Sequence, residues 1–515
     1  MSVRTSMYAA IGGLLLGTAL ATAASAQTRG GDVVYVQQST PPTLDAMTST
    51  EQAVRNISMN IFEMLVALDE GANPVPDLAA SYTESADGLV YVFKIRPGVT
   101  FHNGKLLTSA DVKATFERYG RVGIDRQDFP LIAEIAAVDP MTVRVTLKNR
   151  IPSFIEQISS PRASMIVIPA EQATREAAKI DIIGTGPLQL VEYVPDSHVK
   201  LKRFDAYVPN LAYKGVDGLA GHKVVHVDTV TFRVVPEANA RVAALETKAA
   251  HMSEQIPGQA AKRLKDSKDI KVLPLMPWSM AGMITNAGFG ATAQLGVRKA
   301  IQIAIDAEEL MEIATDGNYR LNHGFVYPES QYFTGDIGKS VYSKRDLAKA
   351  KALLQEAGYK GEEVVVLGSS QVSHIKEQAV IATQQLKAVG INARIELSDT
   401  PTYIARAQQK EGWNLYVGEW GLAPWLGPYG VPNFWTGPKN WQKKDDPQLE
   451  AAFADLKSKP TLKERKEAID RFYTRLFDEV FAVKFGDNGL LQAARNELVG
   501  FKPYRVPRGW GVSLR

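Results

Sequence analysis

Residues 364–397 constrain the fold of this chain most, because they predict a strand, a helix and a second strand in direct succession. The β-branched run VVVLGSS at 364–370 predicts a strand, and residues 376–389 predict a helix that Gly390 ends. A further strand is expected over 391–397. Two strands linked by such a helix pair in parallel, with a right-handed crossover. The chain therefore contains a parallel sheet, which indicates a mixed α/β fold.

The same mixture of strands and helices extends along the rest of the chain. We predict further strands over 32–38, 88–95, 142–148 and 224–235, and helices over 51–66 and 238–250. Two capping motifs mark helix starts, one at Thr108 to Asp111 and one at Thr461 to Glu464, where the helix runs to about residue 480. At roughly 100–200 residues per domain, a chain of 515 residues holds about two to four domains.

The first 26 residues have the pattern of a secretory signal peptide. Arg4 supplies the positive charge, residues 11–20 form an apolar run, and Ala24-Ser25-Ala26 is a small-residue cleavage site. An uncleaved membrane anchor is the alternative, but the apolar run is shorter than the roughly 20 residues that a span needs. The chain has no cysteine, so a lipidated N-terminal cysteine and disulfides are excluded. We expect a non-lipidated protein of a bacterial periplasm.

Charge and motifs exclude several classes of function. The chain has 59 Lys and Arg against 56 Asp and Glu, and this nearly balanced charge does not favour binding to nucleic acid. No G-x-S-x-G, Walker A or strand-linked G-x-G-x-x-G motif follows the signal peptide. His222 and His226 are spaced suggestively, but on the predicted strand they would lie about 13 Å apart. We expect no enzyme, no cofactor and no metal, with an exported hydrolase as the alternative of another class.

Aromatic residues gather in one irregular segment. Five of the seven tryptophans lie within 413–441, among them Trp420, Trp425 and Trp435, with Tyr429 between them. Aromatic rings stack on planar or sugar faces, while the Pro and Gly residues of this segment would fix the loop and admit a ligand to the backbone. The alternative for each ring is a small aromatic core beneath the loop. We expect the loop as a whole to contribute to a ligand pocket.

A series of short motifs runs in a fixed order along almost the whole chain after residue 26. They include PPTLDAM (41–47), DGLVYVFKIRPGVTFHNG (87–104), GTGPLQL (184–190), GVRKAIQIAID (296–306) and QQLKAVGINARIEL (384–397). The second, for example, is similar to D-G-L-x-Y-x-F-x-L-R-x-G-V-x-F-H-D-G. In this order the motifs resemble the family 5 extracellular solute-binding proteins, the periplasmic receptors of peptide, opine and nickel ABC importers.

The resemblance implies a periplasmic binding protein fold, type II-like and of the large three-subdomain class, with the ligand enclosed between two lobes. The first lobe would comprise 27–276 and 483–515, with an inserted subdomain at about 60–180, and the second lobe 277–482. Hinge closure would bury the ligand and present a surface that a membrane permease reads. The implied partners are a small-molecule ligand and the permease subunits of an ABC importer. We expect a monomer.

The resemblance weakens at the ligand. In family members that bind peptides, the loop after the W-G resembles D-Y-P-D-P-D-N-F, and an Asp there pairs the peptide's α-ammonium. Here Trp420 and Asn433 match, the Asp residues are missing, and Glu419 is the acid left in 419–435. A buried ammonium without a carboxylate is costly. Either Glu419 takes this role, as in a generic di- or oligopeptide receptor, or the ligand is a sugar conjugate, an opine-like or an aromatic compound. We favour a non-standard ligand over a generic dipeptide.

Strand ends and crossings provide the remaining candidates. Arg162 is a possible bidentate partner for an anion, and an exposed surface arginine is its alternative reading. The others follow a predicted strand or lie near the first crossing between the lobes: Gln38, Thr40, Trp278, Asn286 and Gln371. Ligands of α/β proteins bind beyond the carboxyl ends of parallel strands, which is the position of Gln371.

Overall fold

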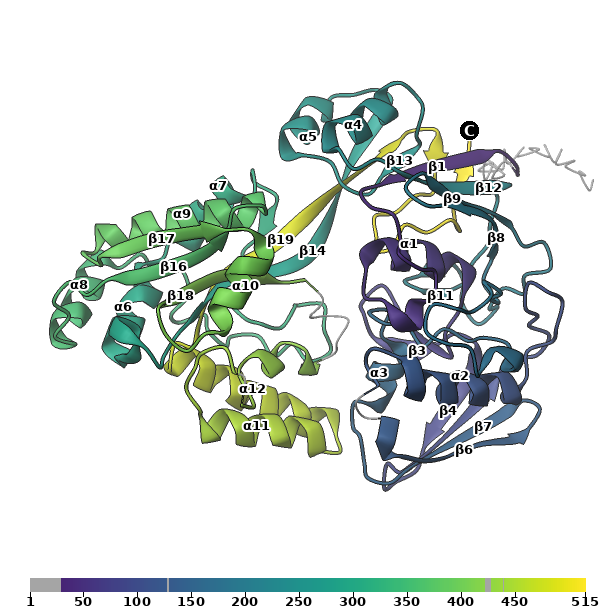
Figure 1. Ribbon diagram of the computed structural model, residues 1–515, viewed down its shortest axis with the longest axis horizontal. Helices are drawn as coiled ribbons and strands as arrows, with labels where there is room; N and C mark the ends of the chain where they lie inside the picture. Colours follow the sequence, from purple (N-terminus) through teal and green to yellow (C-terminus); the bar gives the residue numbers. More distant parts are fainter. Residues whose placement is uncertain (1–28, 127–128, 422–427, 439) are drawn as a thin grey trace, which may run out of the picture.

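Two long antiparallel strands join the two lobes of the molecule (Figure 1). In this computed structural model, which describes residues 29–126, 129–421, 428–438 and 440–515, the two strands are β14 (Ile270–Thr285) and β19 (Ala482–Arg495). They pair with each other on both sides of a register shift between Leu275 and Ser279. We call the chain before β14 and after β19 the first lobe, and the chain between them the second lobe.

The first lobe carries one end of an eleven-stranded sheet that also includes β14 and β19. Outward from β19 its strands are β13 (Met252–Ser253), β1 (Asp32–Gln37), β12 (Thr229–Val234), β9 (His198–Arg203) and β8 (Leu188–Val194). β1 pairs in parallel with both β12 and β13. A small core between this sheet and the helices α4 (Ala238–Glu246) and α5 (Gly258–Leu264) includes Val36, Val242 and Leu264.

A separate antiparallel sheet lies at the far end of the first lobe (Figure 1). Its strands are, in order, β4 (Ala79–Glu84), β5 (Val90–Ile95), β7 (Thr142–Leu147) and β6 (Ile132–Asp139). α2 (Ser109–Val122) contacts β6 and β7 of this sheet, and α3 (Phe154–Ser159) follows β7 in the chain. α1 (Gln52–Ile61) instead contacts β8 of the large sheet. Short strands complete the lobe: β2 (Val66–Leu68), β3 (Pro74–Pro76), β10 (Val216–Asp217), β11 (Ala220–Gly221), β20 (Leu498–Val499) and β21 (Ser513–Leu514).

The second lobe is a sheet with helices on both faces. Beyond β14 the sheet continues through β18 (Leu415–Trp420), β16 (Val364–Ser369) and β17 (Ala393–Ser398), while β15 (Tyr319–Arg320) pairs with β19. One core contains residues of α6 (Leu295–Ala304), α7 (Ala307–Ala314), α8 (Leu347–Glu356) and α9 (Ser373–Ala388). The other contains residues of α10 (Thr400–Gln408), α11 (Pro447–Ser458) and α12 (Leu462–Asp478).

The strand–helix–strand prediction is confirmed in the second lobe. β16 and β17 pair in parallel and α9 connects them. Gly390 follows the helix with a φ of 94°, in the left-handed region that favours glycine. Both capping motifs also form, at Thr108 before α2 and at Thr461 before α12. The local patterns therefore located β16, α9, β17 and the start of α12 in the second lobe, and the start of α2 in the first.

Two predicted boundaries are wrong. The helix expected over 51–66 ends at Ile61, because Phe62 is extended and Val66 enters β2. The strand expected over 224–235 begins only at Thr229, because that residue pairs with Asp32, the first residue of the neighbouring β1. The strand-spacing argument for His222 and His226 therefore does not apply.

Three further observations concern the expected architecture. The predicted lobe boundaries at 276/277 and 482/483 fall inside β14 and at the start of β19, and the division into lobes by residue number stays a prediction. Across the described ranges, no helix is both long and apolar enough to cross a membrane. In the same ranges, no three His, Asp or Glu residues are placed to hold a metal ion.

Candidate ligand-binding cleft

A cavity of about 610 Å³ lies between the two lobes. Its volume is in the range of about 300–1,000 Å³ that encloses small organic ligands. The first lobe contributes Asp125, Ser153, Glu156, Gln157, Ser160 and Arg162. The second lobe contributes Glu419, Trp420, Gly421, Tyr429, Gly430, Val431, Asn433, Phe434, Phe453 and Lys457. We call this space the main cavity, and its walls come from α3 and the loops around it on one side and from β18, α11 and the segment between them on the other.

Glu419 is held in a fixed position at the end of β18. Its Oε2 accepts hydrogen bonds from the Ser279 hydroxyl, from Asn488 Nδ2 at 3.2 Å and from His374 Nε2 at 3.1 Å. Burial alone would raise the pKa of Glu419, but the hydrogen bond and charge of His374, with the Ser279 and Asn488 donors, hold that pKa below its ordinary value. Among the described residues no donor is bonded to Oε1, so one oxygen of an ionised carboxylate remains available in the main cavity.

The positive charges of the main cavity lie on Arg162 and Lys457. Arg162 forms an ion pair with Asp125, which lines the same cavity. Lys457 is different, because no carboxylate in the described parts of the chain pairs with it. Its ammonium lies over the Phe453 ring, 4.3 Å from the centroid. Lys457 is therefore an accessible cation in the same cavity as the free oxygen of Glu419.

Aromatic side chains form the second-lobe wall. Trp420 contacts Phe325 and Trp435, with ring centroids 5.3 Å and 5.5 Å away, and is itself only 5% exposed. Trp435 lies behind it, 1% exposed, in the core of the lobe. Tyr429 and Phe434 are half-buried and line the cavity. The wall thus offers ring surface mainly from Tyr429 and Phe434, with Trp420 supporting it.

Two smaller spaces continue the cleft from the main cavity. The first, which we call the neck, has a volume of about 40 Å³ and shares Glu156 and Val431 with the main cavity. The second, which we call the rear cavity, has a volume of about 250 Å³ and shares Ala72, Tyr327 and Ser330 with the neck. The rear cavity also contacts β14, so the cleft extends from the main cavity to one of the strands that join the lobes.

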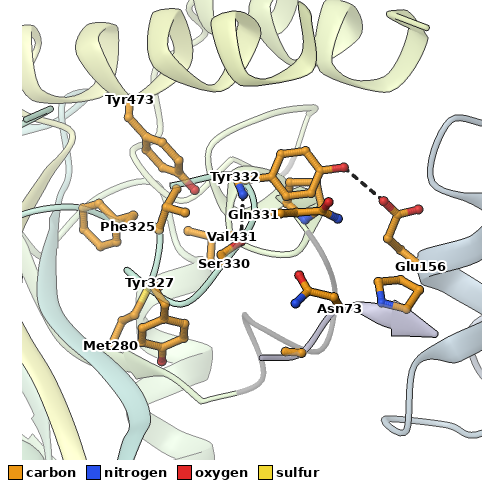
Figure 2. Close-up of a pocket in the computed structure, with 14 residues that line it drawn as sticks. Asn73, Glu156, Met280, Phe325, Tyr327, Ser330, Gln331, Tyr332, Val431 and Tyr473 are labelled. Carbon is orange, nitrogen blue, oxygen red and sulfur yellow. Dashed lines mark hydrogen bonds between the residues drawn. The ribbon is translucent and has the colours of Figure 1, made fainter. Parts of the chain in front are cut away.

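The lobes touch each other at the neck. The Tyr332 hydroxyl of the second lobe donates a hydrogen bond of 3.0 Å to Oε1 of Glu156, which lies in α3 of the first lobe (Figure 2). Burial raises the pKa of Glu156 above its ordinary value, although the charge of Arg465 and the Tyr332 hydroxyl oppose this shift. Arg150 of the first lobe also donates to the carbonyl of Pro460, at 3.3 Å.

Five of the residues predicted from sequence meet on the walls of the main cavity: Arg162, Glu419, Trp420, Tyr429 and Asn433. Trp435 lies in the core behind them, and Trp425 lies outside the described residues. Asn286 is fully buried and donates to the carbonyls of Lys410 and Trp413.

The remaining predicted residues lie away from the lining of these three spaces. The Gln38 backbone donates to Glu254, the Thr40 hydroxyl accepts from the Asp196 backbone, and Gln371 accepts from the Thr400 backbone. Trp278 stacks against the Arg505 guanidinium, whose centre is 4.8 Å from the ring centroid. These contacts all lie within the protein, and a ligand role for the four residues stays a prediction.

Sequence reasoning missed the partners that give the site its charge and shape. His374, Asn488 and Ser279 converge on Glu419 from distant parts of the chain, and Tyr332 meets Glu156 across the cleft. No short motif contains these pairs. Lys457 lies near the end of α11, where an exposed lysine is ordinary, so its type and position carried no signal either.

A ligand-sized cavity between two lobes that are joined by two strands defines the class of two-lobed solute receptors. The chain belongs to the bacterial extracellular solute-binding proteins, family 5, whose model matches residues 73–442. The family expected from the motifs and the periplasmic binding protein fold are both confirmed. The protein is therefore a solute-binding receptor and not an enzyme.

Several known proteins are similar to this chain over most of its length. The glutathione-binding protein GsiB of Escherichia coli O157:H7 is 30% identical over 431 residues, which cover 79% of this chain and 80% of GsiB. The ABC transporter substrate-binding protein CtaP of Listeria monocytogenes has a TM-score of 0.82 and 21% identity, covering 95% of this chain and 100% of CtaP. AgaA of A. tumefaciens R10, solved with agropinic acid, has a TM-score of 0.72 and 22% identity, covering 94% and 99%.

Proposed function

We propose that this receptor is the substrate-binding component of a periplasmic ABC importer, and that it captures a small peptide-like solute with an ammonium group and at least one carboxylate. The observation that carries the proposal is the pair of opposite, accessible charges in the main cavity, on Glu419 and Lys457. A signal peptide cleaved after Ala26 would bring the unlipidated chain to the periplasm.

The ammonium group would bind at Oε1 of Glu419. Three protein donors already fix the other oxygen, so the carboxylate loses little freedom when a cation arrives. A charge-assisted hydrogen bond inside a closed cleft is stronger than one in water. Glu419 would thus perform the role for which the loop after Trp420 offers no aspartate.

The carboxylate end of the solute would bind Lys457 first, because Arg162 is already paired with Asp125. The half-buried rings of Tyr429 and Phe434 would cover the apolar part between the two charged ends. A generic apolar or uncharged solute would make no use of Lys457 or of the free oxygen of Glu419, and would cover both without giving them a new partner.

Two relatives support a small, non-standard solute. GsiB is named for glutathione, a tripeptide with one ammonium and two carboxylates, and AgaA was solved with agropinic acid. Both compounds are small organic acids rather than long peptides, which agrees with a cavity of about 610 Å³. Glutathione also carries the ammonium that Glu419 would accept, so it is the first probe for this receptor.

Calorimetric titration of the purified protein with glutathione and with trialanine tests the proposal. We expect at least one of the two to bind, and Glu419→Gln to weaken that binding about thirtyfold or more, which corresponds to about 2 kcal/mol. Glu396→Gln on β17, a similar change far from the cavity, serves as the control and leaves the affinity unchanged. Full affinity of the Glu419→Gln variant, or no binding of either probe, would contradict the proposed class of solute.

A further inference from the structure

The three spaces of the cleft share lining residues in series, and the middle one has the smallest volume. The neck holds about 40 Å³, while the main and rear cavities hold about 610 Å³ and 250 Å³. A water molecule needs about 10–15 Å³ by the same measure, so the neck admits only a few waters. A peptide chain that leaves the main cavity on this side has no room to continue into the rear cavity.

One hydrogen bond between the lobes closes the neck. Glu156 lines both the main cavity and the neck, and Tyr332 reaches it from the opposite lobe (Figure 2). Tyr332 is only 2% exposed and lines the neck together with Glu156. Asn73, which Figure 2 labels, and Pro74 of the first lobe also line the neck.

The bond between Glu156 and Tyr332 exists only when the lobes are together, because each lobe supplies one partner. The contact between Arg150 and the Pro460 carbonyl also joins the lobes and depends on the same approach. A ligand that extended through the neck would displace the Tyr332 ring and prevent this bond. If the lobes closed around a long ligand, the hydrogen bond between Glu156 and Tyr332 could not form. If they closed around a short ligand, it could.

We propose that the Glu156–Tyr332 pair sets the upper limit on ligand length, so that the receptor selects short peptide-like solutes that end within the main cavity. The inference rests on the proposed function and adds a specificity determinant to it. The rear cavity is of sufficient size to receive one or two further groups of a longer ligand, but the pair separates it from the bound solute. Removing the Tyr332 ring would join the two cavities.

The test compares the lengths of peptides that the protein retains. Wild type and Tyr332→Ala are incubated with an equimolar mixture of random dipeptides to octapeptides, freed of unbound peptide, and denatured for mass spectrometry. We expect wild type to retain only the shortest peptides and Tyr332→Ala to extend the upper limit by at least one residue. Tyr332→Phe, which keeps the ring and loses the hydrogen bond, is expected to shift the limit less.

Each other outcome has a defined meaning. If wild type retains long and short peptides alike, or if Tyr332→Ala leaves the length limit unchanged, the proposed barrier is wrong while the proposed function stands. If wild type retains no peptide of any length and also fails to bind glutathione, the proposed function is wrong and the barrier falls with it. Glu396→Gln controls for handling, and thermal unfolding shows that each variant is folded.

Discussion

At the scale of single residues, the position of Glu419 links ligand binding to the joint between the lobes. Its carboxylate receives hydrogen bonds from Ser279 in β14 and from Asn488 in β19, the two strands that join the lobes. His374 in α9 adds the third bond and the only positive charge among these donors. A ligand that binds the free oxygen of Glu419 therefore contacts a group anchored to both strands.

The ion pair of His374 and Glu419 predicts a dependence of stability on pH. Burial alone would lower the pKa of His374, but the hydrogen bond and the negative charge of Glu419 raise that pKa above its ordinary value. A raised folded-state pKa stabilises the protein below the unfolded pKa, and this stabilisation is lost as pH rises through the folded pKa. In urea unfolding, wild type should exceed His374→Gln in free energy of unfolding by about 1 kcal/mol more at about pH 5.5 than at about pH 8.5. An equal difference at both pH values would contradict the pairing.

At the scale of elements, the turn between α11 and α12 combines stability with contact between the lobes. The Thr461 hydroxyl accepts from the Glu464 backbone, and the Glu464 carboxylate accepts from the Thr461 backbone, which closes the capping box of α12. The preceding residue, Pro460, offers its carbonyl to both Arg150 of the first lobe and Arg465 of α12. The helix start is thereby held where the first lobe meets it.

Loss of the cap should destabilise the protein measurably. Thr461→Ala removes the side-chain acceptor and is expected to lower the free energy of unfolding by about 1 kcal/mol. Lys463→Ala, an exposed position in the same turn, should change it by less than about 0.5 kcal/mol. Chemical denaturation of the two variants beside wild type measures both values. Equal effects of the two substitutions would show that the capping box contributes nothing specific.

Elements built from neighbouring residues were predicted from the sequence, whereas contacts between distant residues were not. The unit of β16, α9 and β17 follows from a β-branched run, a helical segment and Gly390, all of them local signals. Glu419 and Trp420 were found because they stand in a motif. The contact of Tyr332 with Glu156 joins residues 176 positions apart, so only the folded chain brings them together. Residue type alone does not tell a ligand-binding tryptophan from a core tryptophan. Trp435 was predicted in the ligand site, and its ring lies in the core of the second lobe.

At the scale of the whole molecule, two lobes enclose the site and neither provides it alone. The first lobe contributes Glu156 and Arg162 to the main cavity, and the second lobe contributes Glu419 and Lys457. Separating the lobes would open the cavity to water and break the bond between Glu156 and Tyr332. The ligand must therefore supply the differential binding energy that favours the closed form.

The most direct test of this account is mass spectrometry of the compound released when the purified protein is denatured. The account predicts a single small compound, or a narrow set, that carries an ammonium and at least one carboxylate and is no longer than a short peptide. Release of a neutral sugar or of an uncharged aromatic compound would contradict the roles of Glu419 and Lys457. A ladder of long peptides would contradict the length limit at the neck.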